Sequence, residues 1–209
     1  MALVKYNNNS ISAVTAASSI PSGAMTLIKT LTASADATLS FVHGTADVVL
    51  DSTYPIYQFE FINIHAGTNG TNFTFQASTD GGSNYNTAMT TTAIDSYHFE
   101  NDATTNLQYS AGNDQAQGTS FQYITSVMGD DNDDNMSGSL SLYNPSSTTF
   151  VKHYIQNINQ TYSTSQPLSL QELFAGYFNT TSAINAIQFK MSSGNIDSGK
   201  IKLYGIKDS

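Results

Sequence analysis

Polar and apolar side chains alternate with a period of two along much of this chain. Tyr57, Phe59 and Phe61 are separated by polar residues, and Phe73 and Phe75 repeat the arrangement in the next segment. This period is typical of strands with one buried face. It predicts strands at 26–31, 38–43, 56–65, 72–78, 96–100, 121–128, 139–143, 150–157, 175–179, 184–191 and 200–206.

Helical spacing occurs in one short piece, 169–174, where Gln171 and Glu172 are expected to open a single helical or 3₁₀ turn. The many short strands, with clusters of Gly, Asn, Asp and Ser between them, predict an all-β fold. We expect residues 25–209 to form a single antiparallel β-sandwich of jelly-roll type rather than a propeller or solenoid. The last strand alternates outward Lys with inward Ile and Leu, which predicts a strand at the sheet periphery.

Residues 1–24 show no sustained period and contain scattered apolar side chains, namely Leu3, Val4, Ile11 and Val14. A floppy terminus is the common explanation for such a segment. An extended arm that docks on a neighbouring subunit accounts better for the apolar residues, and we predict that arm.

The composition excludes some partners. Only 11 % of the 209 residues are charged, the net charge is -9, and all seven basic residues are Lys. A basic face and arginine forks are what nucleic-acid binding needs, so we expect no nucleic-acid partner. No apolar run is long enough for a membrane span, and 1–25 lacks the pattern of a secretory signal, so no membrane partner is expected either.

An acidic run gives the one candidate metal site. Asp130, Asp131, Asp133 and Asp134 lie within five positions, and their oxygens suit Ca²⁺. The run fails the EF-hand pattern, because Asn135 or Met136 stands where that loop needs Gly. A solvated acidic turn is the interpretation that we favour, with Ca²⁺ as the alternative and no other cofactor expected.

Residues 78–85 resemble the Asp-box turn of sialidase-like propellers, with Tyr85 in place of its Trp. Asp80 is expected to accept backbone N–H bonds across this turn, and Gly81 and Gly82 to supply positive φ. A propeller would carry several copies, so we interpret the single copy as a plain hairpin.

Catalytic chemistry has little support in the sequence. The four histidines are dispersed, and no Gly-x-Ser-x-Gly elbow is present. A glycosidase needs two carboxylates across a cleft, and the only glutamates are Glu60, Glu100 and Glu172. Glu60 alternates with Phe59 and Phe61, so it is expected on the other face of its strand. We predict a protein that is not an enzyme.

Several segments resemble virion structural proteins of tailed bacteriophages of aquatic bacteria. They are 27–31, 59–65, 73–76 with 78–85, 143–149, and 185–191 followed by 204–206. The resemblance spans roughly 27–207, and residues 1–24 share less of it.

The resemblance implies a jelly-roll capsid decoration (cement) protein, made in the host cytoplasm and placed on the capsid exterior. Its partners would be the major capsid protein or other virion proteins, and the implied oligomer is a homotrimer. The alternative is a tail-fibre or receptor-binding module that recognises host surface glycans with exposed tyrosines such as Tyr97, Tyr109, Tyr123 and Tyr162. A third hypothesis is a hydrolase that acts on polysaccharide.

Overall fold

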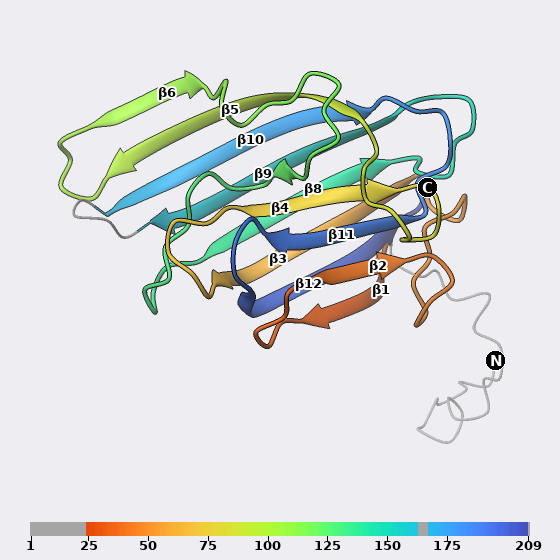
Figure 1. Ribbon diagram of the computed structural model, residues 1–209, viewed down its shortest axis with the longest axis horizontal. Coiled ribbons are helices and arrows are strands. Elements are labelled where there is room, and N and C mark those ends of the chain that lie inside the picture. Colours follow the sequence, from red (N-terminus) through yellow and green to blue (C-terminus); the bar gives the residue numbers. More distant parts are fainter. Residues whose placement is uncertain (1–23, 163–166, 209) are drawn as a thin grey trace, which may run out of the picture.

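The computed structural model describes residues 24–162 and 167–208, and strands form two antiparallel sheets that face each other (Figure 1). The large sheet contains, in spatial order, β1 (Met25–Thr32), β12 (Ile196–Ile206), β3 (Ile56–Ala66), β8 (Met136–Tyr143), β9 (Lys152–Tyr162), β10 (Leu168–Phe178), β5 (Met89–Phe99) and β6 (Thr105–Tyr109). The small sheet contains β2 (Leu39–Val42), β11 (Ala186–Met191), β4 (Phe73–Ser78) and β7 (Gln122–Tyr123). The prediction of an all-β sandwich is confirmed.

The chain crosses repeatedly between the two sheets. β1, β3, β8 and β12 lie side by side in the large sheet, and β2, β4, β7 and β11 make up the small one. Two hairpin pairs interrupt this alternation: β5–β6 follows β4, and β9–β10 follows β8. These four additional strands extend the large sheet beyond β8, and we call them the extension; β1, β12, β3 and β8 with the small sheet are called the sandwich.

Large aromatic side chains fill the space between the two sheets of the sandwich. The Phe189 ring on β11 lies with its centroid 5.3–6.4 Å from those of five phenylalanines. These are Phe41, Phe59, Phe61, Phe73 and Phe75, all at most 1 % exposed. Edge-to-face contacts such as Phe61 to Phe73, at 87°, predominate, which is the geometry favoured by the ring quadrupole. The predicted alternation in 56–65 and 72–78 therefore marks the strands that build this core.

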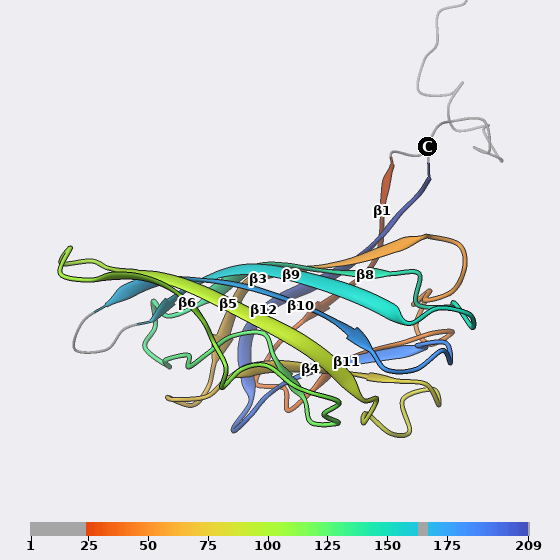
Figure 2. The same cartoon turned by 90° about the horizontal axis from the view of Figure 1, so that it is seen from above.

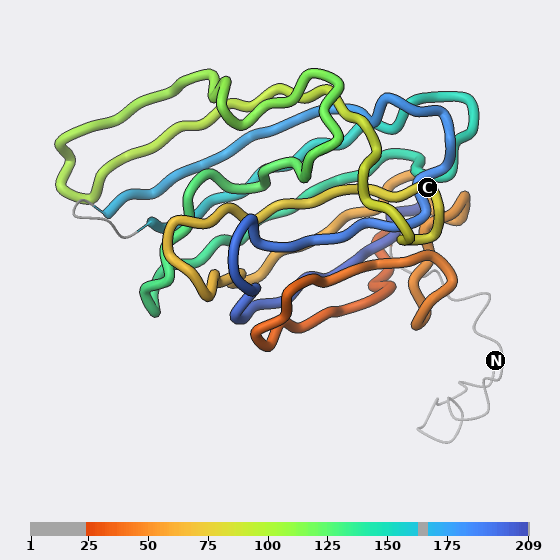
Figure 3. Tube along the Cα trace, viewed as in Figure 1, coloured from red at the N-terminus to blue at the C-terminus, as the bar shows by residue number. Residues whose placement is uncertain are grey.

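The extension projects past the small sheet (Figure 2). Its inner face is covered partly by β4, whose Phe75 ring contacts Tyr154 of β9 and Phe178 of β10. The rest is covered by residues 110–128, which we call the cover segment and which contain β7. The trace between β6 and β8 lies on the same side of the large sheet as the small sheet (Figure 3). Backbone bonds fasten the segment to β5: the Thr91 amide donates to the Gln115 carbonyl, and Met89 and Gly118 exchange both of their bonds.

Several predicted elements need correction. The helical turn at 169–174 is wrong, because β10 runs as a strand through the whole piece with Leu170, Glu172 and Phe174 pointing inward. The last strand is not peripheral: β12 lies between β1 and β3, although its Lys side chains do alternate with buried Ile201 and Leu203. Residues 101–119, which lie between two predicted strands, contain the unpredicted strand β6.

The turn after β4 also differs from the prediction. Residues 79–88 carry the chain from β4 in the small sheet to β5 in the large one, so they form a crossover and not a hairpin. Leu3, Val4, Ile11 and Val14 of the predicted arm lie outside the described residues.

Candidate interaction surfaces

The outer face of the extension carries exposed apolar side chains. Ile94 on β5 lies in register between Leu173 on β10 and Tyr109 on β6. Ile155 on β9 points to the same face and pairs with Ala175, two residues along β10 from Leu173. Leu107 points outward on β6, two residues before Tyr109. Their exposed fractions range from 41 % for Ile94 to 71 % for Leu107. We call these five residues the outer apolar patch.

Next to the patch, the same face is hollowed. Ala175 is too small to fill the space between its neighbours, and the hollow of about 400 Å³ is walled by Ile155, His153 and Tyr177. The His153 and Tyr177 rings contact each other with centroids 5.7 Å apart. A concave apolar surface between exposed apolar residues is typical of a protein contact.

A second hollow, of about 300 Å³, is lined by both aromatic and polar side chains of the cover segment. Phe121 and Tyr123 supply the rings, and Asp114 supplies the carboxylate. The Tyr109 hydroxyl donates to Asp114 Oδ2 at 2.5 Å, and this bond raises the pKa of Tyr109. Rings beside a carboxylate form the kind of surface that a sugar can stack on and bond to.

The tyrosines expected to bind glycans do not share one surface. Tyr109 belongs to the outer apolar patch, and Tyr123 lines the hollow of the cover segment. Tyr97 and Tyr162 lie on the opposite face of the extension, at strand positions beside Leu170 and Leu168. Of the four tyrosines, Tyr123 lines this hollow beside Phe121, a residue that the sequence analysis did not single out. Tyr109 reaches the hollow through the bond from its hydroxyl to Asp114.

The acidic run splits between surface and interior. Asp130, Asp131 and Asp133 are exposed, whereas Asp134 is 1 % exposed. Asp134 lines a hollow of about 290 Å³ together with His65 and Asp197. His65 links Asp197 of β12 to the acidic run. Its Nδ1 lies 3.3 Å from Asp197 Oδ2, and its Nε2 lies 3.0 Å from the Asp131 carbonyl oxygen.

The four carboxylates of the run thus do not converge on one point. Within 24–162 and 167–208, no group of three or more His, Cys, Asp or Glu side chains is arranged to hold a metal ion. The Ca²⁺ site remains a prediction.

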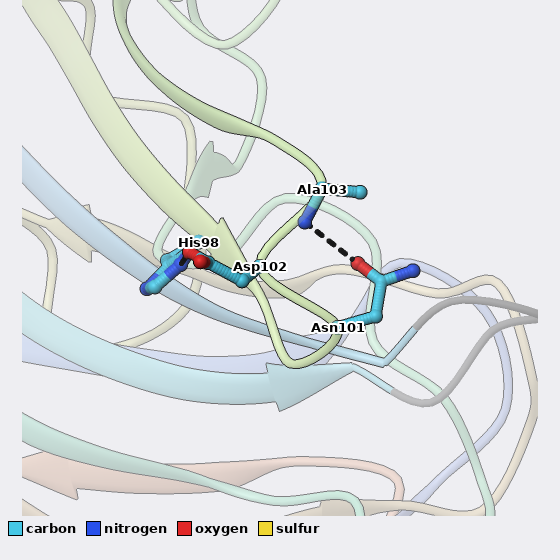
Figure 4. Close-up of polar contacts among 4 residues, drawn as sticks. All are labelled: His98, Asn101, Asp102 and Ala103. Carbon is cyan, nitrogen blue, oxygen red and sulfur yellow. Dashed lines mark hydrogen bonds and ion pairs between the residues drawn. The ribbon is translucent and has the colours of Figure 1, made fainter.

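The other histidines occupy separate places. His98 and Asp102 lie at the tip of the β5–β6 hairpin, with Nε2 3.0 Å from Oδ1, and both are exposed (Figure 4). In the same turn Asn101 Oδ1 accepts the Ala103 amide, so the contacts stabilise a hairpin. His43 Nδ1 accepts the Leu50 amide.

The Asp-box-like turn has the local bonding expected of Asp80. Its carboxylate accepts the Ser78 hydroxyl, the Asn84 amide and the Asn84 side-chain N–H. These bonds hold the pKa of Asp80 at about 2. Gly81 and Gly82 both have positive φ, as expected.

The three glutamates lie far apart in the fold. Glu60 is on the outer face of β3, as predicted, and Glu100 is exposed beyond the end of β5. Glu172 is wholly buried on the inner face of β10, where it faces Asp95 of β5. The sequence analysis missed this pair; the signal was Glu172 standing in the inward alternation of Leu170 and Phe174.

Comparisons with protein-family models, curated proteins and solved structures found no match. In the described part of the chain, no helix has the length and apolar character required to cross a bilayer.

Proposed function

We propose that this protein is a non-enzymatic structural subunit of a bacteriophage virion, of the capsid-decoration (cement) type. The single observation that carries the proposal is the outer apolar patch, because a contiguous set of exposed apolar side chains on a sheet face marks a protein contact. Its partner would be the major capsid protein or a neighbouring virion protein, on the capsid exterior.

The topology supports the same proposal. Strands β1, β12, β3 and β8 face β2, β11, β4 and β7, and each step between consecutive members of the set changes sheet except the step from β4 to β7. We interpret this order as a jelly roll of eight strands with two inserted hairpins. The short similarities to phage virion proteins imply the same fold for this chain, and a homotrimer as the assembly.

The edges of the large sheet offer a second mode of attachment. β1 and β6 are its outermost strands, and within the described part of the chain each pairs on one side only. An extended segment of a neighbouring subunit can add to such an edge through backbone hydrogen bonds. The proposed arm, residues 1–24, would act in this way.

The test is a binding experiment with undecorated capsids. The full-length chain and residues 25–209 would be mixed with capsids, and cosedimentation and the heat resistance of the particles measured. We expect the full-length protein to bind at a fixed copy number and to stabilise the particles. Loss of both effects on removing 1–24 would identify the arm as an attachment.

A matched pair of variants tests the patch. Leu173→Ser lies in the outer apolar patch, and Ile62→Ser is an equally outward apolar position on β3. Leu173→Ser should weaken capsid binding at least tenfold, and Ile62→Ser should leave it unchanged. Equal binding by both variants would contradict the proposed surface.

The hollow around Tyr123 favours one alternative, a receptor-binding module for host surface glycans. A glycan screen would decide it: specific binding that Tyr123→Ala abolishes and Tyr204→Ala preserves supports this function. Binding to capsids with no glycan bound would exclude it in favour of the decoration role.

A further inference from the structure

Two carboxyl groups meet in the interior of the extension. Asp95 of β5 and Glu172 of β10 are directly paired in the strand register and both point to the inner face. Their exposed fractions are 4 % and 0 %. The cover segment contacts the pair from above, because Ser126 bonds to Glu172 through both its amide and its hydroxyl.

Two of the four carboxyl oxygens of the pair are buried without a hydrogen-bond partner. Glu172 Oε1 accepts the two Ser126 bonds, each 2.5 Å long. Glu172 Oε2 and Asp95 Oδ1 are buried and have no hydrogen-bond partner. A buried acceptor without a donor destabilises the folded state, and a buried carboxylate without a counter-ion does so more strongly.

The surroundings of the pair supply no positive charge. The inward residues of β9 opposite Glu172 are neutral: Gln156, Ile158 and Gln160. The ion pairs of the described residues join His65 to Asp197 and His98 to Asp102, at other places. The buried Lys152 ammonium donates to three backbone carbonyls.

The other titratable groups nearby are acids or phenols. The cover segment carries Asp114 and Tyr123, which line its surface hollow. On β5 the next inward residue after Asp95 is Tyr97, and on β6 the Tyr109 hydroxyl is bonded to Asp114. An exception is the Lys190 ammonium of β11, which lies 4.2 Å from the centroid of the Phe121 ring in the cover segment. Among the described residues, no Lys or His is bonded to Asp95 or Glu172.

One proton could serve both unused oxygens, because the two residues are direct partners in the strand register. Two ionised carboxylates are acceptors only, so Oε2 and Oδ1 cannot bond to each other. A proton on one of them would make it a donor to the other, and an O–H···O⁻ bond is among the stronger hydrogen bonds in proteins. The proton would also remove one of two like charges from the interior.

We propose that Asp95 and Glu172 hold one proton between them, and that this shared proton keeps the cover segment closed over the extension as a pH-sensitive latch. When the proton leaves, two negative charges remain side by side in the interior. Water must then reach them, and the cover segment has to open to admit it.

The electrostatics set the pH range. Burial, reinforced by the Asp95 charge, raises the pKa of Glu172 to about 8 against its Ser126 bonds. In the unfolded chain the group titrates at its ordinary value of 4.5. Between these values the folded state holds a proton that the unfolded state has lost, so stability falls as pH rises through this window and levels off above it.

The test compares urea unfolding from pH 5 to 9.5 in the wild type and in Glu172→Gln. The amide oxygen can still accept the Ser126 bonds, and the amide N–H₂ replaces the proton as the donor to Asp95. We expect the unfolding constant of the wild type to rise by up to about tenfold per pH unit between pH 5 and 8 relative to that of the variant. Glu100→Gln, an exposed acid, should keep the wild-type profile.

Hydrogen exchange locates the effect. Amides of 122–128, corrected for the intrinsic pH dependence of exchange, should lose protection above pH 8 in the wild type and keep it in Glu172→Gln. Asp95→Asn should behave in the same way, and it can replace Glu172→Gln in the experiment if that variant does not fold. Identical pH profiles in the wild type and both variants would overturn the proposal.

A cation is the competing occupant. If CaCl₂ or NaCl raises wild-type stability saturably at pH 9 and leaves Glu172→Gln unaffected, an ion takes the place that we assign to the proton. A side-chain carboxyl ¹³C signal of Glu172 that titrates near pH 8 in the absence of Ca²⁺ would support the shared proton.

Discussion

The sandwich and the extension share one sheet but fill their inner faces with different chemistry. Behind β3 and β12 the buried residues are phenylalanines and aliphatic side chains that pack around Phe189. Behind β9, β10 and β5 they include Gln156, Gln160, Glu172 and Asp95. The sandwich is stabilised by apolar burial, whereas the cover segment combines the burial of Ile124 and Met128 with directional bonds.

Those bonds converge on a short stretch of the cover segment. Gln156 donates to the Ile124 carbonyl, Gln160 to the Val127 carbonyl, and Glu172 accepts from Ser126 between them. Rings tolerate small shifts because their packing is weakly directional, but each of these polar groups is left unsatisfied if its partner moves. We therefore expect the sandwich to unfold as a whole and the extension to open locally.

The largest effect is expected at the centre of the sandwich. Phe189→Ala removes a wholly buried ring that contacts five others, and should lower the free energy of unfolding by about 3–5 kcal/mol. Urea unfolding measures it. Phe150→Ala, at a side chain that is 69 % exposed, should change stability by less than about 0.5 kcal/mol. Equal effects would contradict a core centred on Phe189.

The next effect tests a close backbone approach in the sandwich. Gly199 on β12 has φ of +113°, and a Cβ there would lie 2.5 Å from the Asn63 carbonyl oxygen of β3. Gly199→Ala should cost about 2–4 kcal/mol through strain and overpacking. Gly112→Ala, in open space, is the control and should be neutral within about 1 kcal/mol. The pairing of β12 with β3 is irregular between Ser198 and Lys200, and a neutral result at Gly199 would show that this irregularity relaxes freely.

A smaller and local effect is expected in the extension. Gln156→Met keeps the volume but leaves the Ile124 carbonyl unbonded, which should cost about 1–3 kcal/mol. Hydrogen exchange should speed up in 122–128 and stay unchanged in β3 and β11. Gln171→Met, on the outer face of β10, should leave the exchange of 122–128 as it is. Faster exchange throughout the molecule would remove the distinction between the two regions.

The smallest effect is expected in residues 79–88, the crossover from β4 in the sandwich to β5 in the extension. Because hydrogen bonds from Ser78 and Asn84 hold the pKa of Asp80 at about 2, their stabilisation is complete above its ordinary pKa of 3.8 and is lost as pH falls through about 2. An NMR titration should place the Asp80 midpoint near 2, and Ser78→Ala should move it upward. An unchanged midpoint in Ser78→Ala would mean that this hydroxyl does not set the pKa.

Strands with one buried face were predictable, and those without one were not. The residues of β3 and β4 alternate between rings and polar groups, so their existence could be predicted closely, even though both faces of β4 proved to be buried. All five residues of β6 are exposed, and among the described residues it pairs with β5 alone, so no hydrophobic period marks it. β5 was predicted only from residue 96, because its first half is a run of threonines in which the buried positions carry little apolar signal.

The candidate sites depended on contacts between distant segments. Asp134 is indistinguishable by type from its exposed neighbours Asp130 and Asp133, and only the packing against Gly129 and the hollow at His65 sets it apart. The outer apolar patch consists of one or two apolar residues on each of four strands, and each residue is unremarkable in its own segment. Tyr97 and Tyr109, two equally plausible ligand-binding residues in the sequence, lie on opposite faces.

The sequence by itself determined that this chain is an antiparallel β-sandwich with an aromatic core. Side chains in a strand alternate between its two faces, and this period of two is visible within each short segment of the sequence. Only the tertiary structure decided that Glu172 is a strand residue facing Asp95 and that the cover segment closes over both. Helical and extended spacings are hard to tell apart in a short piece, and a carboxyl pair assembled by strand register leaves no trace in either segment alone.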